Sequence, residues 1–454
     1  MIRKLPLYTK IIYGSADLGF SLTSTIIGAY FLFFLINVVG VSGTTAGLAI
    51  LAGRTWDYIN DPLIGHLSDR TRSRWGRRRP FLLFGALPFA LAFIMMWYKP
   101  PFSSQAVLIL YYAFAYVFYD TAATFVYMPY FALTPELTDD YDERTSVMSY
   151  RAFFSIVGSL IAFIVPLMII GSLIPENADR VLLMAVIFGL FSALPLLLVF
   201  FTVREREEFS RQEKPQLTDS FKAFLKNRPF IFAAIVYLVT WVCIDLLQGI
   251  LLFYIKHVLE REAMSDLIMA LIFVTAVLVL PFWVWVSRRT DKRKSYAIGT
   301  AFLAAVLLAL TAVTTNVPFG IVIVLCILAG VGVSAAHVLP WSLLPDAVEY
   351  DEYQTGNRHE GMFFSLVTLA QKIASSITIP LIGVLLDVTG YVSNAAVQPA
   401  SAVNSIRLLV GPIPGVFLMI GIIFALKFPI DRDEFARIIS TLKQRREEAS
   451  LGKA

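Results

Sequence analysis

Two acidic residues, Asp57 and Asp61, lie four positions apart near the end of a long apolar stretch. At that spacing two side chains share one face of a helix on successive turns. A carboxylate near the centre of a bilayer costs about 2.5–3.5 kcal/mol on insertion scales, so the pair needs a compensating cation. Two carboxylates can share one Na⁺, which prefers hard oxygen ligands, or hold one proton when no metal ion is bound. The pair predicts an intramembrane cation site and an ion-coupled carrier.

Other ionisable residues interrupt apolar runs elsewhere in the chain. Lys372 must find an acid if it lies in a membrane, and the acid pair and Asp120 are the available candidates. Asp245 lies within another apolar run, where contact with substrate, proton binding and pairing with the lysine all remain open. For His337 we expect a hydrogen-bonded core or cavity-lining position rather than a proton relay.

The composition predicts that lipid surrounds these residues. Hydrophobic residues make up 57% of the chain and charged residues only 16%, with a mean hydropathy of +0.70, which exceeds what a soluble protein of this size needs to fill its core. The net charge of +5 comes from basic residues clustered in short segments between apolar runs. These clusters fit membrane topology, and we expect no nucleic-acid partner. Cys243 and Cys326 lie in separate apolar runs, which indicates neither a disulfide framework nor a metal site.

About twelve apolar runs are long enough to span a bilayer. We expect the spans at 8–37, 44–68, 80–99, 104–131, 147–172, 180–203, 229–256, 265–288, 295–315, 318–345, 360–388 and 406–429. The loops around 70–79, 204–214 and 288–294 are rich in arginine and lysine and should face the cytoplasm. An even number of spans then places both termini in the cytoplasm, in a multi-pass protein of a plasma membrane, such as a bacterial inner membrane.

The spans divide into two groups of six around a polar segment. We expect a six-helix bundle at 1–203 that holds the cation site and most of the cargo site, and a cytosolic linker at 204–228 with an amphipathic helix. A second bundle follows at 229–430, and a cytosolic tail at 431–454 forms a solvated or interfacial helix. A weak internal repeat agrees, because the segment 68–72 is echoed at 287–293. Two related halves are typical of carriers that work by alternating access.

Five segments resemble, in order and spacing, the glycoside-pentoside-hexuronide:cation symporters, a branch of the major facilitator superfamily that includes melibiose permease. They are RTWDYINDP at 54–62, TRSRWGRRRP at 71–80, MPYFALTPEL at 128–137, YDERTSVMSYRAFFSIVG at 141–158 and PWSLLPDAVEYDEYQTGNRHEG at 340–361. The resemblance runs nearly end to end. It implies an all-α integral membrane protein with twelve transmembrane helices in two six-helix bundles.

The resemblance also implies a role for individual residues. The coupling cation, Na⁺ or H⁺, would be bound by Asp57, Asn60 and Asp61, with a salt bridge to Arg54 as the alternative for the acids. Substrate recognition would use a set of polar and aromatic residues, which are Asp17, Asp120, Thr124, Arg151, Trp341, Thr368 and Lys372. Carboxylates accept hydroxyl hydrogen bonds and an arginine fork binds vicinal oxygens, so this set suits a polyhydroxylated ligand. Pairing of the acids with Arg151 or Lys372 only to hold helices together is the structural alternative.

Two positions depart from the family pattern. Val117 replaces a threonine that supplies a sodium ligand in melibiose permease, which weakens sodium relative to protons as the coupling ion. Thr124 stands at the position of a tryptophan that stacks on the sugar, which weakens a galactoside assignment. The loop that contains Asp69 and Arg70 resembles the superfamily's gating charge relay, and a purely topological role for its cations is the alternative.

The sequence thus predicts a symporter of a sugar or glycoside with a cation, with no cofactor, acting as a monomer. A symporter of lysophospholipid or another amphiphile with the same fold is the alternative, since Val117 and the phenylalanines Phe31, Phe33 and Phe34 could form an apolar cleft. Enzymatic catalysis is not expected, because the sequence contains no GxSxG, HExxH or P-loop motif. A channel is disfavoured because the charges gather on few helices.

Overall fold

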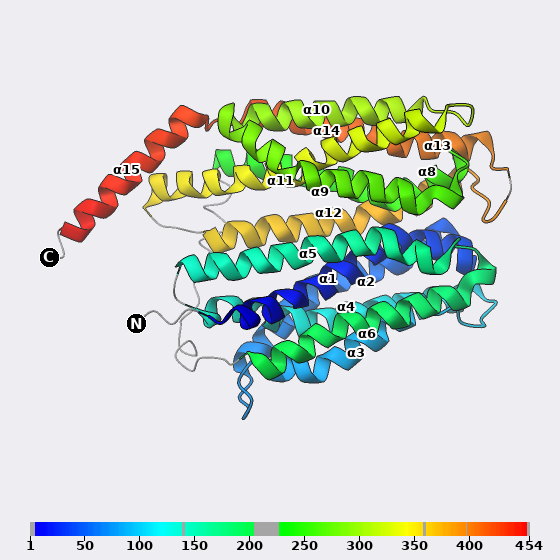
Figure 1. The fold of residues 1–454 in the computed structure, drawn as a ribbon, viewed down its shortest axis with the longest axis horizontal. Helices are drawn as coiled ribbons and strands as arrows, with labels where there is room; N and C mark the ends of the chain where they lie inside the picture. Colours follow the sequence, from blue (N-terminus) through cyan, green and yellow to red (C-terminus); the bar gives the residue numbers. More distant parts are fainter. Residues whose placement is uncertain (1–4, 139–140, 204–226, 357–359, 396, 452–454) are drawn as a thin grey trace. The chain divides into compact units, whose positions relative to one another are not determined.

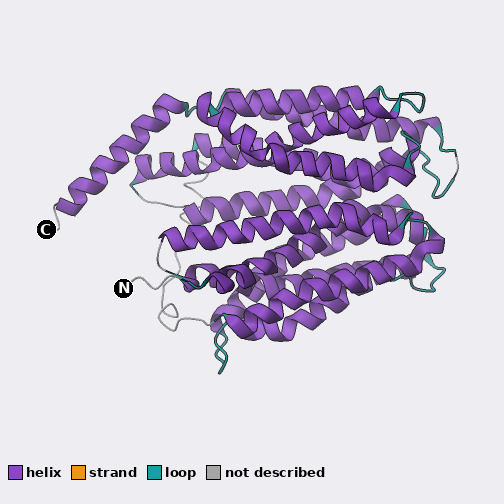
Figure 2. Cartoon of the chain, viewed as in Figure 1, coloured by secondary structure: helices purple, strands orange, loops and turns teal. Residues whose placement is uncertain are grey.

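The computed structural model describes residues 5–138, 141–203, 227–356, 360–395 and 397–451, and these residues form helices and loops without strands (Figures 1 and 2). The first half of the chain contains α1 (Leu7–Phe34), the π-helical turn η1 (Leu35–Val39), α2 (Gly43–Arg70), α3 (Arg79–Trp97), α4 (Gln105–Leu137), α5 (Tyr141–Ile170), η2 (Pro175–Asn177) and α6 (Ala178–Thr202). The second half contains α8 (Arg228–His257), η4 (Glu262–Met264), α9 (Ser265–Arg289), α10 (Lys292–Thr311), α11 (Phe319–Thr355), α12 (Glu360–Val388), α13 (Ala400–Val410), α14 (Pro412–Leu426) and α15 (Arg432–Leu451).

Eleven helical segments of the described chain are long and apolar enough to cross a membrane, with α13 and α14 counted together. The second predicted span, α2, is not among them although it is 28 residues long. Its composition explains this, since α2 carries Arg54, Asp57 and Asp61 in its middle and Asp69 and Arg70 at its end. The all-α membrane fold is confirmed, and the predicted span that is less apolar than the others is the one that bears the acid pair.

The chain forms two compact units. Unit 1 comprises Met1–Glu213, Gln248–Ala270 and Ser376–Ile406, and unit 2 comprises Lys214–Leu247, Leu271–Ser375 and Arg407–Ala454. Unit 1 thus contains α1 to α6 and η4, together with one end each of α8, α9, α12 and α13. The linker expected at 204–228 with its amphipathic helix lies almost wholly outside the described residues.

Unit 1 has an aromatic core between α1, α3 and α4. The ring of Phe31 lies 5.5 Å from that of Trp97 and 6.2 Å from that of Tyr112, measured between centroids. Phe31, Phe33 and Phe34 are at most 2% exposed. These three phenylalanines fill the interior of unit 1 in this structure, whereas Val117, the other residue expected at an apolar cleft, is only partly buried.

Unit 2 has its own apolar core, to which the tail contributes. Ile438 and Leu442 on α15 are 1% and 4% exposed and belong to a cluster that includes Leu343 and Val348 of α11. Since these side chains lie one turn apart, one face of α15 is buried on unit 2. The tail helix therefore packs its apolar face on protein, where the sequence suggested a solvated or interfacial helix.

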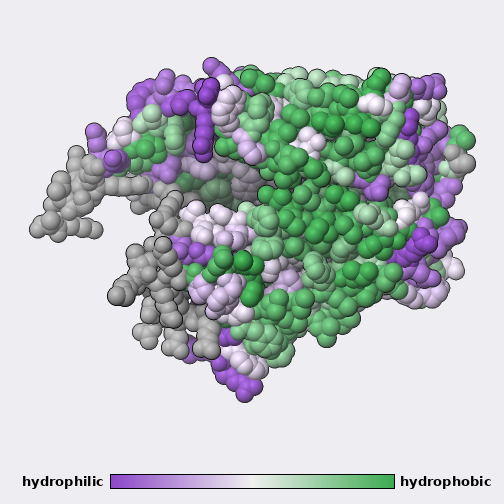
Figure 3. Space-filling view, in the orientation of Figure 1, coloured by the Kyte–Doolittle hydropathy of each residue, from purple (hydrophilic) through white to green (hydrophobic). Residues whose placement is uncertain are grey.

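The exterior is apolar along the helices. On the face shown in Figure 3, hydrophobic residues cover the middle of the helices and hydrophilic residues gather at their ends. Large apolar side chains such as Leu110, Phe201 and Leu278 are 70–73% exposed. Exposed apolar surface on this scale fits a lipid environment.

Candidate functional site

The acid pair lies on a helix that packs closely on α4. A Cβ atom added at Gly53 would collide with the ring of Tyr116, so the absence of a side chain there lets α2 approach α4. Two hydrogen bonds join the helices just before the acids, from Arg54 Nε to the Tyr116 hydroxyl at 3.3 Å and from Trp56 Nε1 to Thr121 Oγ1 at 2.9 Å. The α2–α4 contact thus fixes the backbone that carries the carboxylates.

The structure brings four of the predicted residues together on these two helices. Thr124 donates a hydrogen bond to Oδ1 of Asp61 at 3.2 Å. The side-chain amide of Asn60, which is 2% exposed, donates to the backbone carbonyl of Asp120 at 3.3 Å. Asp57 lies one turn before Asp61 on the same helix. Carboxylate, amide and hydroxyl oxygens are thus available within one short stretch of two helices, a donor set that suits a small monovalent cation or a proton.

Asp17 and Arg151 form a second polar cluster in unit 1, between α1 and α5. Arg151 donates from Nε to Oδ2 of Asp17 at 2.6 Å and from Nη2 to Oδ1 at 3.2 Å, which is a two-pronged ion pair. The hydroxyl of Tyr130 on α4 also donates to Oδ2 of Asp17 at 2.6 Å. The two charged side chains are only 12% and 9% exposed. A buried pair of this kind is well compensated, because each oxygen has a donor.

Aromatic and hydroxyl groups hold the guanidinium of Arg151 in place. It lies 5.2 Å from the ring centroid of Tyr130 and 5.0 Å from that of Phe131. Its Nη1 donates to Oγ1 of Thr134 at 2.9 Å, and the hydroxyl of Tyr13 lies 2.8 Å from the same Oγ1. The structure therefore presents Arg151 in one fixed orientation, as recognition of a planar pair of oxygens requires.

Unit 2 contains the other predicted residues. Trp341 is 40% exposed, and its ring lies 4.8 Å from that of Tyr237 and 6.4 Å from that of Phe364, with which it is stacked. Thr368 is exposed, and its hydroxyl donates to the carbonyl of Phe364 at 2.8 Å. Lys372 is partly buried one turn further along α12. An exposed tryptophan on an aromatic base provides a flat apolar surface next to polar groups.

Two partly buried polar residues of unit 2, Asp245 and His337, have clear surroundings. Ser375 on α12 donates a short hydrogen bond to Oδ2 of Asp245 on α8, which joins the two helices. His337 lies beside Trp241, and its Nδ1 is 3.2 Å from the carbonyl of Val333. The histidine is thus hydrogen-bonded and partly buried, and a core or cavity-lining role rather than a proton relay stays a prediction.

The sequence matches the family described as MFS/sugar transport protein over residues 12–432. This chain belongs to that family. It is 31% identical to the uncharacterized symporter sll1374 of Synechocystis, over 98% of each chain. It is 29% identical to an Escherichia coli protein named as a glycoside/cation symporter, YagG, over 92% of each chain. It is 26% identical to the sodium-dependent lysophosphatidylcholine symporter 1-A of Danio rerio, over 95% of this chain and 87% of that one.

Solved transporter structures share the fold of this MFS protein. The D-xylose-proton symporter superposes with a TM-score of 0.68 at 15% identity, over 93% of this chain and 97% of that one. A bacterial homologue of the lysosomal transporter Spinster gives a TM-score of 0.66 at 12% identity, over 96% and 97% of the two chains. The protein is thus a secondary active transporter of the major facilitator superfamily, and not an enzyme.

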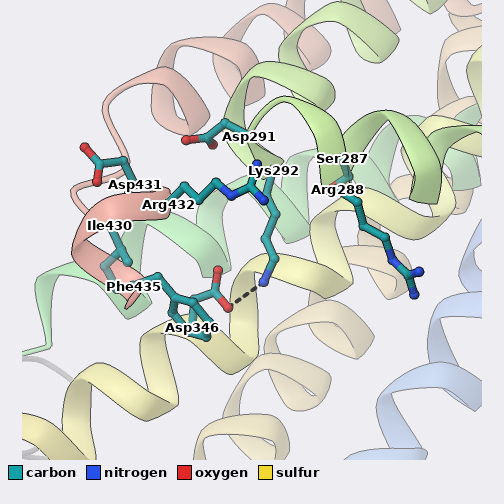
Figure 4. A pocket seen from close by; sticks show the side chains of 9 residues that line it. All are labelled: Ser287, Arg288, Asp291, Lys292, Asp346, Ile430, Asp431, Arg432 and Phe435. Atoms are coloured by element: carbon teal, nitrogen blue, oxygen red, sulfur yellow. Dashed lines mark hydrogen bonds and ion pairs between the residues drawn. The ribbon is translucent and has the colours of Figure 1, made fainter. Parts of the chain in front are cut away.

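One ion pair of this MFS transporter escaped the sequence analysis. Lys292, the first residue of α10, donates to Oδ1 of Asp346 on α11 at 2.6 Å and to the carbonyl of Ser342 at 3.0 Å. Asp346 is 5% exposed and lies in a cavity of about 430 Å³ between the α9–α10 turn, α11 and the start of α15 (Figure 4). Asp346 lies in the segment 340–361, one of the five family-like motifs, and this position could have marked it as a candidate in the sequence.

The start of α15 closes another side of this cavity. The backbone N–H of Glu434 donates to Oδ1 of Asp431 at 2.9 Å, as at a helix N-cap. That bond and the nearby guanidinium of Arg293 hold the pKa of Asp431 below its usual range. Arg293 in turn donates to the carbonyl of Phe428 at 2.8 Å, which anchors the α9–α10 turn to the chain that leads into the tail.

The predicted gating residues lie at the end of α2. Arg70 is its last residue and is exposed, while the side chain of Asp69 lies outside the described part of the structure. The same loop is anchored through Arg79, which donates to the carbonyl of Phe200 on α6 from both Nε at 3.1 Å and Nη2 at 2.5 Å. A gating role for Asp69 and Arg70 stays a prediction.

Proposed function

We propose that this transporter moves a sugar or glycoside together with Na⁺ or H⁺, with the cation at the α2–α4 contact. The observation that carries the proposal is the carboxylate of Asp61 on α2, which receives a hydroxyl hydrogen bond from Thr124 on α4. Asp57, Asn60 and Asp61 then hold the cation, and we add the hydroxyl oxygen of Thr124 to them. Ionisable residues kept inside a membrane usually serve transport, because their insertion is costly.

The proposed cargo site in unit 1 is built on Asp17, Arg151 and Asp120. A guanidinium fork can bind two neighbouring hydroxyl oxygens, and the carboxylates can accept from hydroxyl groups. Because Asp17 and Arg151 are paired in this structure, a sugar would exchange bonds with groups that are already oriented and desolvated. In unit 2, Trp341, Thr368 and Lys372 remain predictions for cargo contacts, with the tryptophan suited to the apolar face of a sugar ring.

Coupling of cargo transport to the cation would follow from the negative charge of the cation site. A carrier without its coupling cation should resist the conformational change, because excess negative charge within the membrane is costly. Binding of the cation neutralises the site and lowers that cost, so the cation and cargo raise the population of the same state. One charge moving inward at 100 mV supplies about 2.3 kcal/mol, enough for roughly fifty-fold accumulation of cargo.

An amphiphile is the second candidate cargo. The relative from Danio rerio is named as a sodium-dependent lysophosphatidylcholine symporter and is similar along nearly the whole chain. In this structure Phe31, Phe33 and Phe34 are buried, whereas Val117, which also suggested an apolar cleft, is partly exposed. The buried ion pair of Asp17 and Arg151 also suits hydroxyl groups better than an acyl chain.

We place the protein in a plasma membrane with both termini in the cytoplasm, as a monomer, with Asp69 and Arg70 in gating. The distribution of arginine and lysine supports this orientation, since Arg70 and Arg79 bound one short loop rich in cations.

The test is uptake into proteoliposomes of a panel of labelled glycosides and of lysophosphatidylcholine, with and without Na⁺ or pH gradients. We expect gradient-driven accumulation of a glycoside by the native protein. Asp61→Asn should abolish accumulation but allow equilibration, whereas Asp179→Asn, an exposed acid at the start of α6, should behave like the native protein. Accumulation by Asp61→Asn would refute the cation site, and accumulation of the lysolipid alone would refute the sugar assignment.

A further inference from the structure

Four ring-bearing side chains of unit 2 form a cluster between α8 and α11. Tyr237 and Trp241 lie one turn apart on α8, and His337 and Trp341 lie one turn apart on α11. The ring centroids of Trp241 and His337 are 5.5 Å apart, and those of Tyr237 and Trp341 are 4.8 Å apart. Both contacts are edge-to-face. Trp341 is a predicted cargo residue, so its three neighbours lie close to the proposed cargo contacts of unit 2.

Trp241 carries a hydrogen-bond donor that the protein does not satisfy. Its Nε1 is shielded from solvent and has no hydrogen-bond partner among the described residues. A buried donor that is left without a partner costs about 1–3 kcal/mol, and most buried polar groups therefore have one. An acceptor that is not part of the protein would remove this cost.

The imidazole of His337 offers the complementary atom. Its Nδ1 lies 3.2 Å from the carbonyl oxygen of Val333, one turn earlier on α11. A carbonyl oxygen only accepts hydrogen bonds, so this contact places a proton on Nδ1. In the neutral ring Nε2 is then an acceptor, and no residue that the structure describes donates to it. An unused donor and an unused acceptor therefore belong to two rings in contact.

Trp97 in unit 1 shows that an unsatisfied indole alone is not evidence for a site. Its Nε1 is also buried without a partner in the described chain. The ring, however, packs against Phe31, Phe34 and Phe93, whose side chains contain no acceptor atom. The indole of Trp241 differs because an imidazole nitrogen lies in the neighbouring ring.

A third helix joins the cluster to the other predicted cargo residues of unit 2. The hydroxyl of Tyr237 donates to Oε1 of Gln371 on α12 at 2.5 Å. Thr368 lies three positions before Gln371 on that helix, and Lys372 follows it directly. The helices α8, α11 and α12 thus meet at the cluster, and each contributes a polar side chain to it.

We propose that Trp241 and His337 bind one hydroxyl group of the cargo, which accepts a hydrogen bond from Nε1 of Trp241 and donates one to Nε2 of His337. A hydroxyl group suits this pair because it both donates and accepts. A carboxylate or phosphate group only accepts, and an ammonium group only donates, so neither satisfies both rings. Trp341 then provides apolar surface beside that hydroxyl group. The inference rests on the proposed function, since it requires a hydroxylated cargo, and it assigns recognition of one neutral hydroxyl group to unit 2.

Uptake into proteoliposomes by two variants tests the site. The probe is the labelled glycoside that the native protein accumulates, compared with analogues that each lack one ring hydroxyl group. Trp241→Phe removes the N–H and keeps an aromatic ring. We expect the half-saturating concentration of the full glycoside to rise about threefold to tenfold, the value for one lost hydrogen bond, while that of one analogue stays unchanged. His337→Phe should remove the preference for the same hydroxyl group.

Trp97→Phe is the matched control, because it removes the other unsatisfied indole N–H and should leave every preference unchanged. Native preferences retained in both Trp241→Phe and His337→Phe would overturn the site, and so would loss of preference for two different hydroxyl groups. Thermal unfolding shows whether each variant folds, and if one does not, the other is sufficient to decide.

Failure of the sugar assignment is a separate outcome of the same measurement. If the native protein accumulates lysophosphatidylcholine and no glycoside, the sugar assignment is wrong. The probes are then the lysolipid and its analogue without the glycerol hydroxyl group. An unchanged preference between these two in Trp241→Phe and His337→Phe would overturn the hydroxyl site by itself.

Discussion

Thr124 on α4 donates a hydrogen bond to Asp61 on α2 across 3.2 Å. The sequence places this threonine where the related symporters have a tryptophan that stacks on sugar, and it places Val117 where they have a cation-binding threonine. The structure shows that a hydroxyl oxygen from the same helix is nevertheless available to the carboxylate, two turns further along. We propose that this oxygen replaces the missing threonine ligand, which keeps Na⁺ a candidate coupling ion.

Thr124→Val should lower the affinity for the cation without abolishing cation binding. The substitution keeps the shape of the side chain and removes one oxygen, and a hydrogen bond of this kind is worth about 0.5–1.5 kcal/mol. We expect the cation concentration for half-maximal uptake to rise about threefold to tenfold. Uptake measured against Na⁺ concentration and against pH would show which ion is affected.

Thr55→Val is the matched control for this measurement. Thr55 lies on α2, and its exposed hydroxyl donates to the carbonyl of Leu51 in its own helix. Its loss should leave the cation dependence unchanged. Equal cation dependence in the Thr124→Val and native proteins would mean that Thr124 does not serve the cation.

Arg151→Lys should separate cargo recognition from helix packing. Lysine keeps the charge near Asp17 but cannot present two donors in a fixed fork. We therefore expect the half-saturating cargo concentration to rise tenfold or more, while the protein still folds. Asp17→Ala should instead lower the free energy of unfolding by about 3–5 kcal/mol, because it leaves a buried guanidinium unpaired.

The ion pair between Lys10 and Glu143 offers a control on the same two helices. Its atoms are 2.8 Å apart, and its side chains are 12% and 10% exposed, much like those of the site pair. Glu143→Gln should reduce thermal stability but leave cargo half-saturation unchanged. If Arg151→Lys behaved in the same way, Arg151 would be a structural residue only.

Lys292→Met should destabilise unit 2. Asp346 would keep its buried position and lose its cation, which costs about 1–3 kcal/mol for a group left without its partner. The double change with Asp346→Asn should recover part of the loss, because an amide tolerates burial better than a charge. Thermal unfolding in detergent, followed by tryptophan fluorescence, measures both effects.

An exposed pair on the tail serves as the comparison. Arg437 and Glu434 are 2.8 Å apart on α15, and the arginine side chain is 76% exposed. Glu434→Gln should change stability by less than about 0.5 kcal/mol, as is usual for surface pairs. A similar small effect of Lys292→Met would show that the Lys292–Asp346 pair adds little to the fold.

The sequence by itself determined the membrane class, the helices and the acid pair. Apolar runs of about 20 residues can only cross a bilayer as helices, because every backbone group must be paired within the segment. Asp57 and Asp61 stood out for the same reason, since charge in such a run is costly wherever the helix packs. These inferences need only composition and local spacing.

Only the tertiary structure decided which side chains meet. The partners Thr124 and Asp61 are 63 residues apart, Asp17 and Arg151 are 134 apart, and Asp387 and Gly43 are 344 apart. Contacts over such separations depend on how helices rotate and approach one another, and small residues such as Gly53 and Gly383 set that approach. Phe31, Phe33 and Phe34 show the same limit of sequence analysis, because hydrophobicity alone does not tell whether apolar side chains line a cleft or fill a core.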